Sequence, residues 1–372
     1  MSRFTFTLAC SEDDPQLRAR MAEDRMDGSI SVSFRREPDY FAGSRLQGDE
    51  VQVIVCRDTL NGRIAGLGSR CAARFHVNGT PMRAGYLADL RCDPAYRKGT
   101  LLPRGYRFLH ELQRADPLPA YSTIIFESNR AALQSLVGNR AGLPAYLPMG
   151  RMLTPAIHLD FAKPDIHVPG IALRRSQPGD LEHIVAFLNR RMATRQFSPV
   201  YRPSDFLPGG RCAGMTPSSF YLAERDGALV GTIAAWDQAA IRQTHIERYS
   251  SALSVMRPFY NLASRFTALK SLPAVGARIP YLYLCCVAIE NDDVDVFRSL
   301  LRFIYNQLRN GLWHYAIAGL HERDPLASVL AEYRAISAAG LLYRVEFPRQ
   351  MDAGPEPVVP DDRVPYFEMA LA

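Results

Sequence analysis

The sequence lacks the cysteine and histidine spacings that a disulfide framework or a metal site requires. Seven cysteines occur among 372 residues, an odd number, and no two of them form a CxxC pair. None of the eight histidines forms a pair four residues apart, and no serine–histidine–aspartate order stands out. We therefore expect no metal, no disulfide, and buried thiols in a reducing compartment.

Long apolar runs are also absent. No uncharged apolar stretch approaches the roughly 18–20 residues that a membrane-spanning helix needs. The first ten residues and the acidic Ser-Glu-Asp-Asp that follows contain no apolar core of a signal peptide. These absences predict a cytoplasmic protein that has no membrane partner.

The length of the chain and its repeated pattern indicate two domains. A chain of 372 residues exceeds the usual range of roughly 100–200 residues for one domain. The clearest break lies at 160–170, where two prolines and a glycine interrupt the apolar periodicity. Strand, helix, hairpin, strand, helix, strand and helix follow in the same order on either side. The sequence therefore predicts an α/β (α+β) fold with domains at 1–165 and 166–372.

Periodicity and turn signals place the elements of each half. In the first half, strands are predicted at 4–9, 51–56, 63–74, 84–92 and 123–126, and helices after 13–15, at 102–112 and at 129–137. In the second half, strands are predicted at 171–174, 220–225, 229–236, 281–289 and 315–320, and helices at 181–188 and 297–308.

Positive charge is concentrated in one segment of the second half. The net charge of +6 favours an anionic partner, such as a CoA phosphate, a nucleic acid or a membrane surface, without choosing among them. Six lysines and arginines stand between 239 and 279 against one acid, Glu247. We interpret this segment as a basic helical insertion. It is either a solvated helical face or a surface that meets a ligand or partner.

The segment 86–105 carries the strongest functional signal. An apolar strand is followed by a short basic loop and by a helix that begins near 102–103. Such a helix start leaves unpaired amides and the positive end of the helix dipole facing one point, which favours a phosphate. Arg97 and Lys98 add positive charge, and Gly99 lets the backbone approach an anion closely.

This segment resembles the acyl-CoA motif of the GNAT acyltransferase superfamily. The strand carries L-x-C-x-P at 90–94, and an arginine-initiated loop opens the following helix. E-S-N at 127–129 and the turn at 141–143 also fit the family pattern. The resemblance covers about residues 1–160 and recurs weakly in 170–350. It implies two tandem GNAT-like domains, the second degenerate, whose mixed and mostly antiparallel sheets are flanked by helices.

The resemblance implies acetyl-CoA or a longer acyl-CoA as cosubstrate, with no metal. By this analogy the amides of Leu90, Arg91 and Cys92 hold the pantetheine arm and the thioester carbonyl, and Asn129 contacts the arm. The pyrophosphate would lie on the loop and helix start formed by Arg97, Lys98, Gly99, Thr100, Leu101 and Leu102. The family usually has small residues three and five positions after the arginine. Here threonine and leucine stand there, so altered phosphate binding is expected.

GNAT chemistry, as the resemblance implies it, is direct attack of an amine on a thioester. The reaction needs a base, an amide that holds the carbonyl oxygen, and an acid for the departing thiolate. Asp89 and Glu127 are the available carboxylates, and we expect burial to raise the pKa of either one. Tyr86 and Tyr146 are the candidate acids. The alternatives are ion-paired carboxylates and tyrosines that pack in the core, and the family's usual helical tyrosine is missing near 136–137.

The corresponding run of the second half, 281–294, differs in charge. Its loop carries Glu290, Asp292 and Asp293 in place of arginine and glycine, so a pyrophosphate would meet like charge. We expect this half not to bind CoA in the family manner. It would serve a structural role or form one wall of an acceptor cleft.

The sequence therefore predicts an acyl-CoA-dependent N-acyltransferase that acts on an unidentified amine. A non-catalytic tandem module that binds an acyl carrier, a metabolite or a protein stays open, because Thr100, Leu102 and the missing tyrosine favour it. Transfer from aminoacyl-tRNA rests only on the basic segment 239–279. The aromatic and basic patterning of nucleic-acid surfaces is weak, so we do not expect a nucleic-acid partner.

Overall fold

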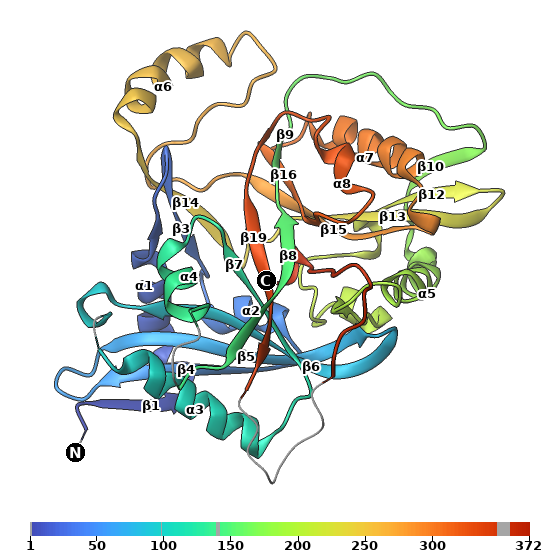
Figure 1. The fold of residues 1–372 in the computed structure, drawn as a ribbon. Coiled ribbons are helices and arrows are strands. Elements are labelled where there is room, and N and C mark those ends of the chain that lie inside the picture. Colours follow the sequence, from blue (N-terminus) through green and yellow to red (C-terminus); the bar gives the residue numbers. More distant parts are fainter. Residues whose placement is uncertain (1, 98, 139–141, 348–357) are drawn as a thin grey trace.

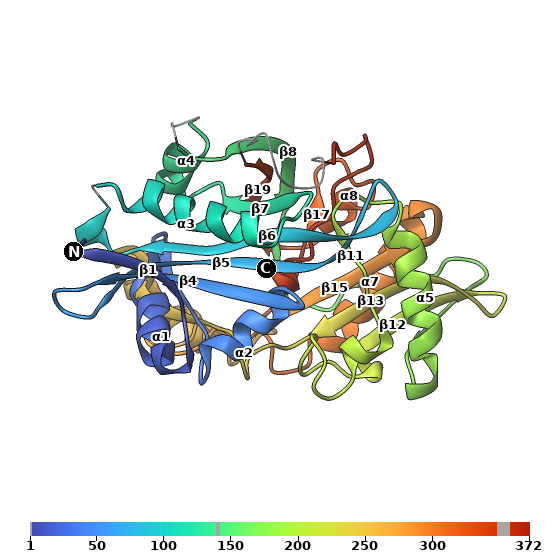
Figure 2. The ribbon, with the colours of Figure 1, turned by 90° about the horizontal axis from the view of Figure 1, so that it is seen from below.

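The computed structural model describes residues 2–97, 99–138, 142–347 and 358–372, and strands within these ranges form three sheets (Figure 1). Two sheets are large and mixed, and the third is a small antiparallel sheet beside them. Helices lie against the large sheets, which is the predicted α/β arrangement of two mixed sheets (Figure 2).

The first large sheet is built mainly from the N-terminal half. Its order is β1 (Phe4–Leu8), β4 (Glu50–Asp58), β5 (Ile64–Val77), β6 (Thr80–Cys92), β7 (Tyr121–Phe126), β19 (Ala339–Glu346), β8 (Ala145–Leu153) and β17 (Leu320–His321), and β11 (Ser198–Pro199) pairs with β5. The pair β6–β7 is parallel and the others are antiparallel. Asn78 and Gly79 between β5 and β6 both have positive φ, which confirms the hairpin turn predicted there.

The second large sheet repeats this plan. Its order is β10 (Ile171–Arg175), β12 (Phe220–Arg225), β13 (Ala228–Trp236), β15 (Tyr281–Ile289), β16 (Tyr315–Ala318), β9 (Ala156–His158) and β18 (Ala335–Ile336). Again one pair, β15–β16, is parallel and the others are antiparallel. The parallel pair therefore occupies an equivalent place in each sheet, between the fourth and fifth strands of the order.

The two halves of the chain exchange strands. β9 comes from the N-terminal half and joins the second sheet, where it lies between β16 and β18. In return β17 and β19 come from the C-terminal half, and β19 lies between β7 and β8 of the first sheet. Each half is thus tied to the other by backbone hydrogen bonds, and the chain passes from the first sheet to the second at 154–155, between β8 and β9.

Helices sandwich the first sheet. Figure 2 shows α3 (Leu101–Ala115) and α4 (Arg130–Leu136) on one face and α1 (Asp14–Glu23) and α2 (Tyr40–Ser44) on the other. Leu109 of α3 packs with Leu87 and Ile125 of the sheet, and Leu17 of α1 packs with Val53 and Val55. Each helix buries its apolar face in this way, which is how amphipathic helices are held on a sheet.

The second sheet is covered in the same manner. α7 (Val294–Leu308) and α8 (Ala327–Leu330) pack in one core with β13 and β15, and α5 (Leu181–Met192) packs in another. The apolar spacing that predicted α7 is confirmed, because every residue of the set is buried: Phe297, Leu300, Leu301, Ile304 and Leu308.

The basic segment 239–279 is only partly helical, which corrects the prediction of a helical insertion. It begins as β14 (Gln243–Tyr249), which pairs with β3 (Ile30–Arg35) in the small sheet completed by β2 (Arg25–Met26). Thr244, Ile246 and Tyr249 of β14 are buried, and this pairing with a distant strand outweighs local helical preference. The helix that follows is α6 (Ser251–Ala263).

The seven cysteines are free thiols. Five of them are buried, but Cys10 is exposed and Cys92 is only partly buried, so the expectation of buried thiols is wrong for these two. Over the described ranges, no helix has the length and apolar character needed to cross a membrane.

Candidate functional site

The parallel strands β6 and β7 separate soon after they meet. Gly85 pairs with Tyr121 and Tyr86 pairs with Ser122, and no later ladder pair joins the two strands in the part of the chain that the structure describes. Gly85 is required here, because a side chain at this position would overlap the ring of Tyr121. Beyond the pair, β6 stays bonded to β5 and β7 stays bonded to β19. A split therefore opens between β6 and β7, with the facing edge of β6 at 88–92.

A bulge distorts β6 inside this split. Leu67 of β5 faces Arg91, whereas Ser69 faces Ala88, so Gly68 alone lies opposite Asp89 and Leu90. Asp89 has φ of 55°, a left-handed conformation that aspartate tolerates better than most residues. A bulge of this kind turns side chains and amides away from the regular ladder, and bulges are frequent beside active sites. Leu90, in the bulge, is 46% exposed.

The carboxylate of Asp89 is held by a buried arginine. Arg36 Nη2 lies 2.6 Å from Asp89 Oδ2, in an ion pair whose geometry is not that of a well-directed hydrogen bond. Arg36 also donates to Ser44 Oγ at 2.6 Å and lies over the ring of Tyr40. Burial acts to raise the pKa of Asp89, but Arg36 and further arginines outweigh it, so this pKa lies below its usual value. Asp89 is therefore an ionised carboxylate at neutral pH.

The C-terminal half contributes a second, partly buried cation to this cluster. Arg242 Nε and Nη2 donate to the carbonyl oxygen of Gly43 at 3.1 and 2.9 Å. Burial, together with the charge of Arg36, lowers the pKa of Arg242 to about 10. Tyr86 is buried on the same side of the sheet, where it packs against Phe367, and burial raises the pKa of its hydroxyl. Residues of both halves thus surround the bulge.

The helix that follows the split has an open N-terminus. α3 begins at Leu101, its N-cap residue Thr100 makes no side-chain capping bond, and its first turn contains no acid. The amides of Leu101 and Leu102 therefore lack the intrahelical partners that later residues have, and the positive end of the helix dipole lies there. Pro103 at the third position has no N–H, which leaves one donor fewer than usual. A side chain at Gly99 would meet nothing within 4 Å, so the loop has free space beside it.

Arginines gather beside this helix start. Arg97 Nε donates to the carbonyl oxygen of Cys92 at 3.0 Å, and Arg97 Nη2 lies 3.5 Å from Asp24 Oδ1. Asp24 is also within 3.0 Å of Arg20 and 3.8 Å of Arg91. Three guanidinium groups thus share one carboxylate. Lys98, which the sequence predicted to add charge to the loop, lies outside the described residues.

The other predicted catalytic residues lie apart from Asp89. Glu127 follows the end of β7 and forms a bidentate pair with Arg151 at 2.5 and 2.9 Å. Tyr146 lies on the opposite face of the sheet from Tyr86, among the residues that pack under α3 and α4, where it forms a hydrogen bond with Tyr106. Burial raises the pKa of Tyr146 to about 12.

The expectation that burial would raise the pKa of the two carboxylates is wrong for both. The hydrogen bonds from Arg151 lower the pKa of Glu127, just as arginines lower that of Asp89. In each case the cation outweighs desolvation. Asn129, which the resemblance assigned to the cofactor arm, uses its side-chain oxygen to accept a bond of 3.1 Å from Ala132 N and so caps α4.

The second half contains the same split and the same bulge. β15 and β16 pair only from Tyr281 to Leu284, and Cys286 has φ of 53° where the register with β13 shifts. In the second half a side chain of the protein, Glu368, lies at this bulge. Cys286 N donates to Glu368 Oε2 at 2.9 Å, and Tyr366 OH donates to the same oxygen at 2.7 Å.

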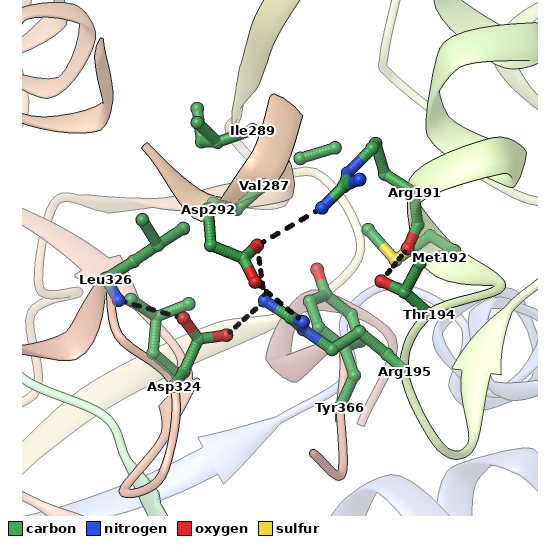
Figure 3. A pocket seen from close by; sticks show the side chains of 12 residues that line it. Arg191, Met192, Thr194, Arg195, Val287, Ile289, Asp292, Asp324, Leu326 and Tyr366 are labelled. Atoms are coloured by element: carbon green, nitrogen blue, oxygen red, sulfur yellow. Dashed lines mark hydrogen bonds and ion pairs between the residues drawn. The ribbon is translucent and has the colours of Figure 1, made fainter. Parts of the chain in front are cut away.

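The helix start of the second half is filled as well. Asp293 Oδ1 accepts bonds from Asp295 N and Val296 N and thereby caps α7. Figure 3 shows the small pocket left at the end of β15, where Arg195 lies between Asp292 and Asp324 at 2.8 and 3.2 Å. Carboxylates of the chain thus lie both at the bulge and at the helix start of the second half.

The whole arrangement matches known structures. No protein-family model and no curated protein matches the sequence. A GCN5-related N-acetyltransferase from Sphaerobacter thermophilus is 13% identical, with a TM-score of 0.53 over 95% of this chain and 98% of that one. Saccharomyces cerevisiae N-myristoyltransferase with bound myristoyl-CoA is 11% identical, with a TM-score of 0.61 over 94% and 80%. The chain has the tandem GNAT fold.

A further GCN5-related N-acetyltransferase, from Anabaena variabilis, agrees with this fold. It is 14% identical and has a TM-score of 0.52 over 92% of this chain and 72% of that one. The family resemblance inferred from 86–105 is thus confirmed at the level of fold. Within this fold β6 leads through the bulge at Asp89 to the start of α3 at Leu101, which is the strand, loop and helix order expected from the sequence, and the donor-binding role of this segment stays a prediction.

Two parts of the site were not found from the sequence. Arg36 carries no local signal, because an arginine in a polar stretch is expected at the surface. Glu368 does carry one: it is a single acid within Y-F-E-M-A-L, and an acid between large apolar residues on a buried segment needs internal hydrogen-bond partners. Neither the partner of Arg36 nor that of Glu368 can be read from sequence spacing, since they lie 53 and 82 residues away.

Proposed function

We propose that this chain is an acyl-CoA-dependent N-acyltransferase whose donor enters the split between β6 and β7. The observation that carries the proposal is the difference between the two halves. The second split is occupied by Glu368 and its helix start by Asp293, whereas the first has an uncapped helix start without acids. Of the two helices that follow the splits, α3 offers an anion uncapped amides at the positive end of its dipole, whereas Asp293 caps α7.

The donor would bind along the open edge of β6. The pantetheine arm would extend along 88–92, where β6 has no ladder partner on the side of β7. The pyrophosphate would lie at the start of α3, near the amides of Leu101 and Leu102 and the guanidinium of Arg97. The donor class comes from fold neighbours, one of which was solved with bound myristoyl-CoA.

The chemistry would be one acyl transfer. The amine nitrogen attacks the thioester carbon, the C–N bond forms, and the C–S bond breaks to release CoA. Asp89 and Glu127 are the candidate acceptors of the proton that the amine loses, and both are ionised at neutral pH because arginines lower their pKa. Tyr86 and Tyr146, whose pKa values are raised by burial, keep their protons and are the candidate donors to the thiolate.

A non-catalytic module that binds an acyl donor is the second candidate. The observation in its favour is that Asp89 and Glu127 are both held in ion pairs with arginine, which makes each a weaker base. This candidate shares the donor site and differs only in whether an acyl group is transferred.

Calorimetry with acetyl-CoA, longer acyl-CoAs and free CoA tests the donor site. We expect micromolar binding to the wild type and at least about tenfold weaker binding to Arg97→Glu with Gly99→Pro, because the variant reverses a charge and stiffens the loop. Arg225→Glu, a charge reversal at the last residue of β12 in the second half, is the matched control and should bind like the wild type. Absence of binding at millimolar ligand by folded protein would rule out the proposal.

A thiol-release assay then separates the two candidates. Released CoA is measured for each acyl-CoA that binds, with and without a panel of primary amines. Amine-dependent release supports the transferase, and tight binding without release for any amine supports the non-catalytic module.

A further inference from the structure

Helix α6 carries its apolar face toward solvent. Six of the fourteen large apolar side chains that are exposed in the described residues lie between 255 and 275. Five of them form the apolar face of α6, and their exposed fractions are 53–82%: Val255, Met256, Phe259, Leu262 and Phe266. Their spacing of three, four and seven residues places them on one side of the helix and its C-terminal extension. No residue of α6 is buried.

The opposite side of α6 is polar and is bonded to its own return segment. Arg257 Nε donates to the carbonyl oxygens of Leu272 and Pro273 at 3.2 and 3.1 Å. Asn261 exchanges two hydrogen bonds with the backbone of Leu272, and Tyr249 OH donates to Pro273. The orientation of α6 is therefore fixed by hydrogen bonds on its inner side, and its apolar side stays outward. Figure 1 shows the helix at the edge of the molecule, apart from both large sheets.

The segment that carries this face contains several cations and no acid. Between 248 and 289 there is no aspartate or glutamate, and five cations are present: Arg248, Arg257, Arg265, Lys270 and Arg278. Arg257 and Lys270 donate to backbone carbonyls, and neither forms an ion pair within the described residues. Arg248 is 72% exposed and lies 3.8 Å from Asp27, itself an exposed side chain. The apolar face is thus accompanied by an excess of positive charge.

We propose that α6 is a docking surface for an anionic phospholipid bilayer, on which it lies with Phe259 and Phe266 in the headgroup region. Outward apolar side chains accompanied by arginine and lysine are the composition of helices that bind in the plane of a membrane surface. The basic residues provide the attraction to anionic headgroups, and the apolar side chains provide the burial.

Shape and charge favour a bilayer over the other partners. A helix that stands out from the body is convex, and a fluid bilayer receives a convex apolar face without needing a shaped groove. A second copy would bring two sets of five cations together, and like charges at close range repel. The prediction of no membrane partner rested on the lack of a spanning segment, and a helix that lies on the surface needs none.

Flotation of the full chain with lipid vesicles tests the proposal. Pure phosphatidylcholine vesicles are compared with vesicles that also contain phosphatidylglycerol. We expect at least about tenfold more protein on the anionic vesicles, falling as salt rises. Phe259→Ser with Phe266→Ser should remove most of this binding, and Arg248→Glu with Arg265→Glu should remove the preference for anionic lipid.

Leu60→Ser is the matched control, because Leu60 is a 74% exposed apolar residue in the β4–β5 turn, and it should bind like the wild type. All substituted side chains are exposed, so thermal unfolding should change little and will show that each variant is folded. Equal binding to both vesicle types, or an equal loss in Leu60→Ser, would overturn the proposal. Absence of vesicle binding would also overturn the proposal. This outcome includes the case in which Phe259 and Phe266 mediate self-association or bind an acidic protein instead. Acyl-CoA binding should be the same in all variants, so this test is independent of the proposed activity.

Discussion

Glu368 accepts a hydrogen bond of 2.9 Å from the amide of Cys286, the residue at which the strand β15 bulges. Asp89 occupies the equivalent bulge of β6, where no later ladder pair joins β6 to β7 in the described chain. The two halves thus contain the same backbone feature, and in the second half a buried carboxyl group is bonded to it.

The buried acid makes stability depend on pH. Burial raises the pKa of Glu368 above its usual value, and the bonds from Cys286 and Tyr366 only partly oppose this. Because the folded state holds its proton to higher pH than the unfolded chain, stability from this group falls as pH rises from about 4.5 through the folded pKa. Glu368→Gln removes this loss while its amide oxygen still accepts both bonds.

We therefore expect Glu368→Gln to gain stability relative to the wild type as pH rises from 4.5 to 8. Urea unfolding across this range measures the difference. Glu182→Gln, an exposed acid on α5, is the control and should give a flat difference. A difference that stays flat in Glu368→Gln would show that the buried carboxyl is ionised at no extra cost.

Gly85→Ala should destabilise the first half. The added methyl group would overlap the ring of Tyr121 at the only place where β6 and β7 pair in the described chain, and overpacking of this kind costs about 1–3 kcal/mol. Denaturant unfolding measures the cost. Gly179→Ala provides the control, because a side chain there meets nothing within 4 Å and the backbone has no positive φ. Equal effects in the two variants would mean that the Tyr121 ring moves aside freely.

Asp89→Asn tests the proposed base. Asparagine tolerates the positive φ of this bulge, so we expect the acyl-CoA Kd to stay within about twofold and kcat to fall by about 100-fold or more. Glu127→Gln, at the end of the other strand, separates the two candidates, since only the true proton acceptor should show the loss in kcat. Unchanged kcat in both variants would assign proton removal to another group. Loss of the Asp89 charge leaves Arg36 without its partner, so unfolding is measured alongside.

Local features of this protein could be read from its sequence, and long-range ones could not. The Asn78-Gly79 hairpin and the buried face of α7 follow from turn chemistry and from a spacing of three and four residues. The insertion of β19 between β7 and β8 joins residues about two hundred positions apart, and no local period encodes such a pairing. β14 was mistaken for helix for the same reason, because its partner β3 lies far away in the chain.

In the candidate site, too, local features could be predicted from the sequence and long-range ones could not. The loop 93–100 and the start of α3 were recognised, since a strand–loop–helix motif is contiguous. The low pKa of Asp89 was not, because it depends on Arg36, which approaches from another element. Charges that act through space are set by the fold, and only the fold shows whether burial or a nearby cation decides a pKa.

Asp24 should compete with the donor for the arginines beside α3. Its carboxylate lies 3.0 Å from Arg20, 3.5 Å from Arg97 and 3.8 Å from Arg91, so it neutralises cations that a pyrophosphate would use. We expect Asp24→Asn to tighten acyl-CoA binding by about threefold to tenfold and to steepen its salt dependence, because guanidinium groups bind phosphate bidentately once they are released. Calorimetry at two salt concentrations measures both effects.

Asp27→Asn makes the same change in net charge at an exposed position, where the side chain is 79% accessible, and should leave donor binding unchanged. Tighter acyl-CoA binding by both variants would mean that the gain in affinity comes from overall charge alone. Weaker binding in Asp24→Asn alone would reverse the interpretation. Asp24 would then be the residue that holds Arg91 and Arg97 in place for the phosphates, since an unpaired guanidinium on a long side chain loses orientation before it gains a ligand.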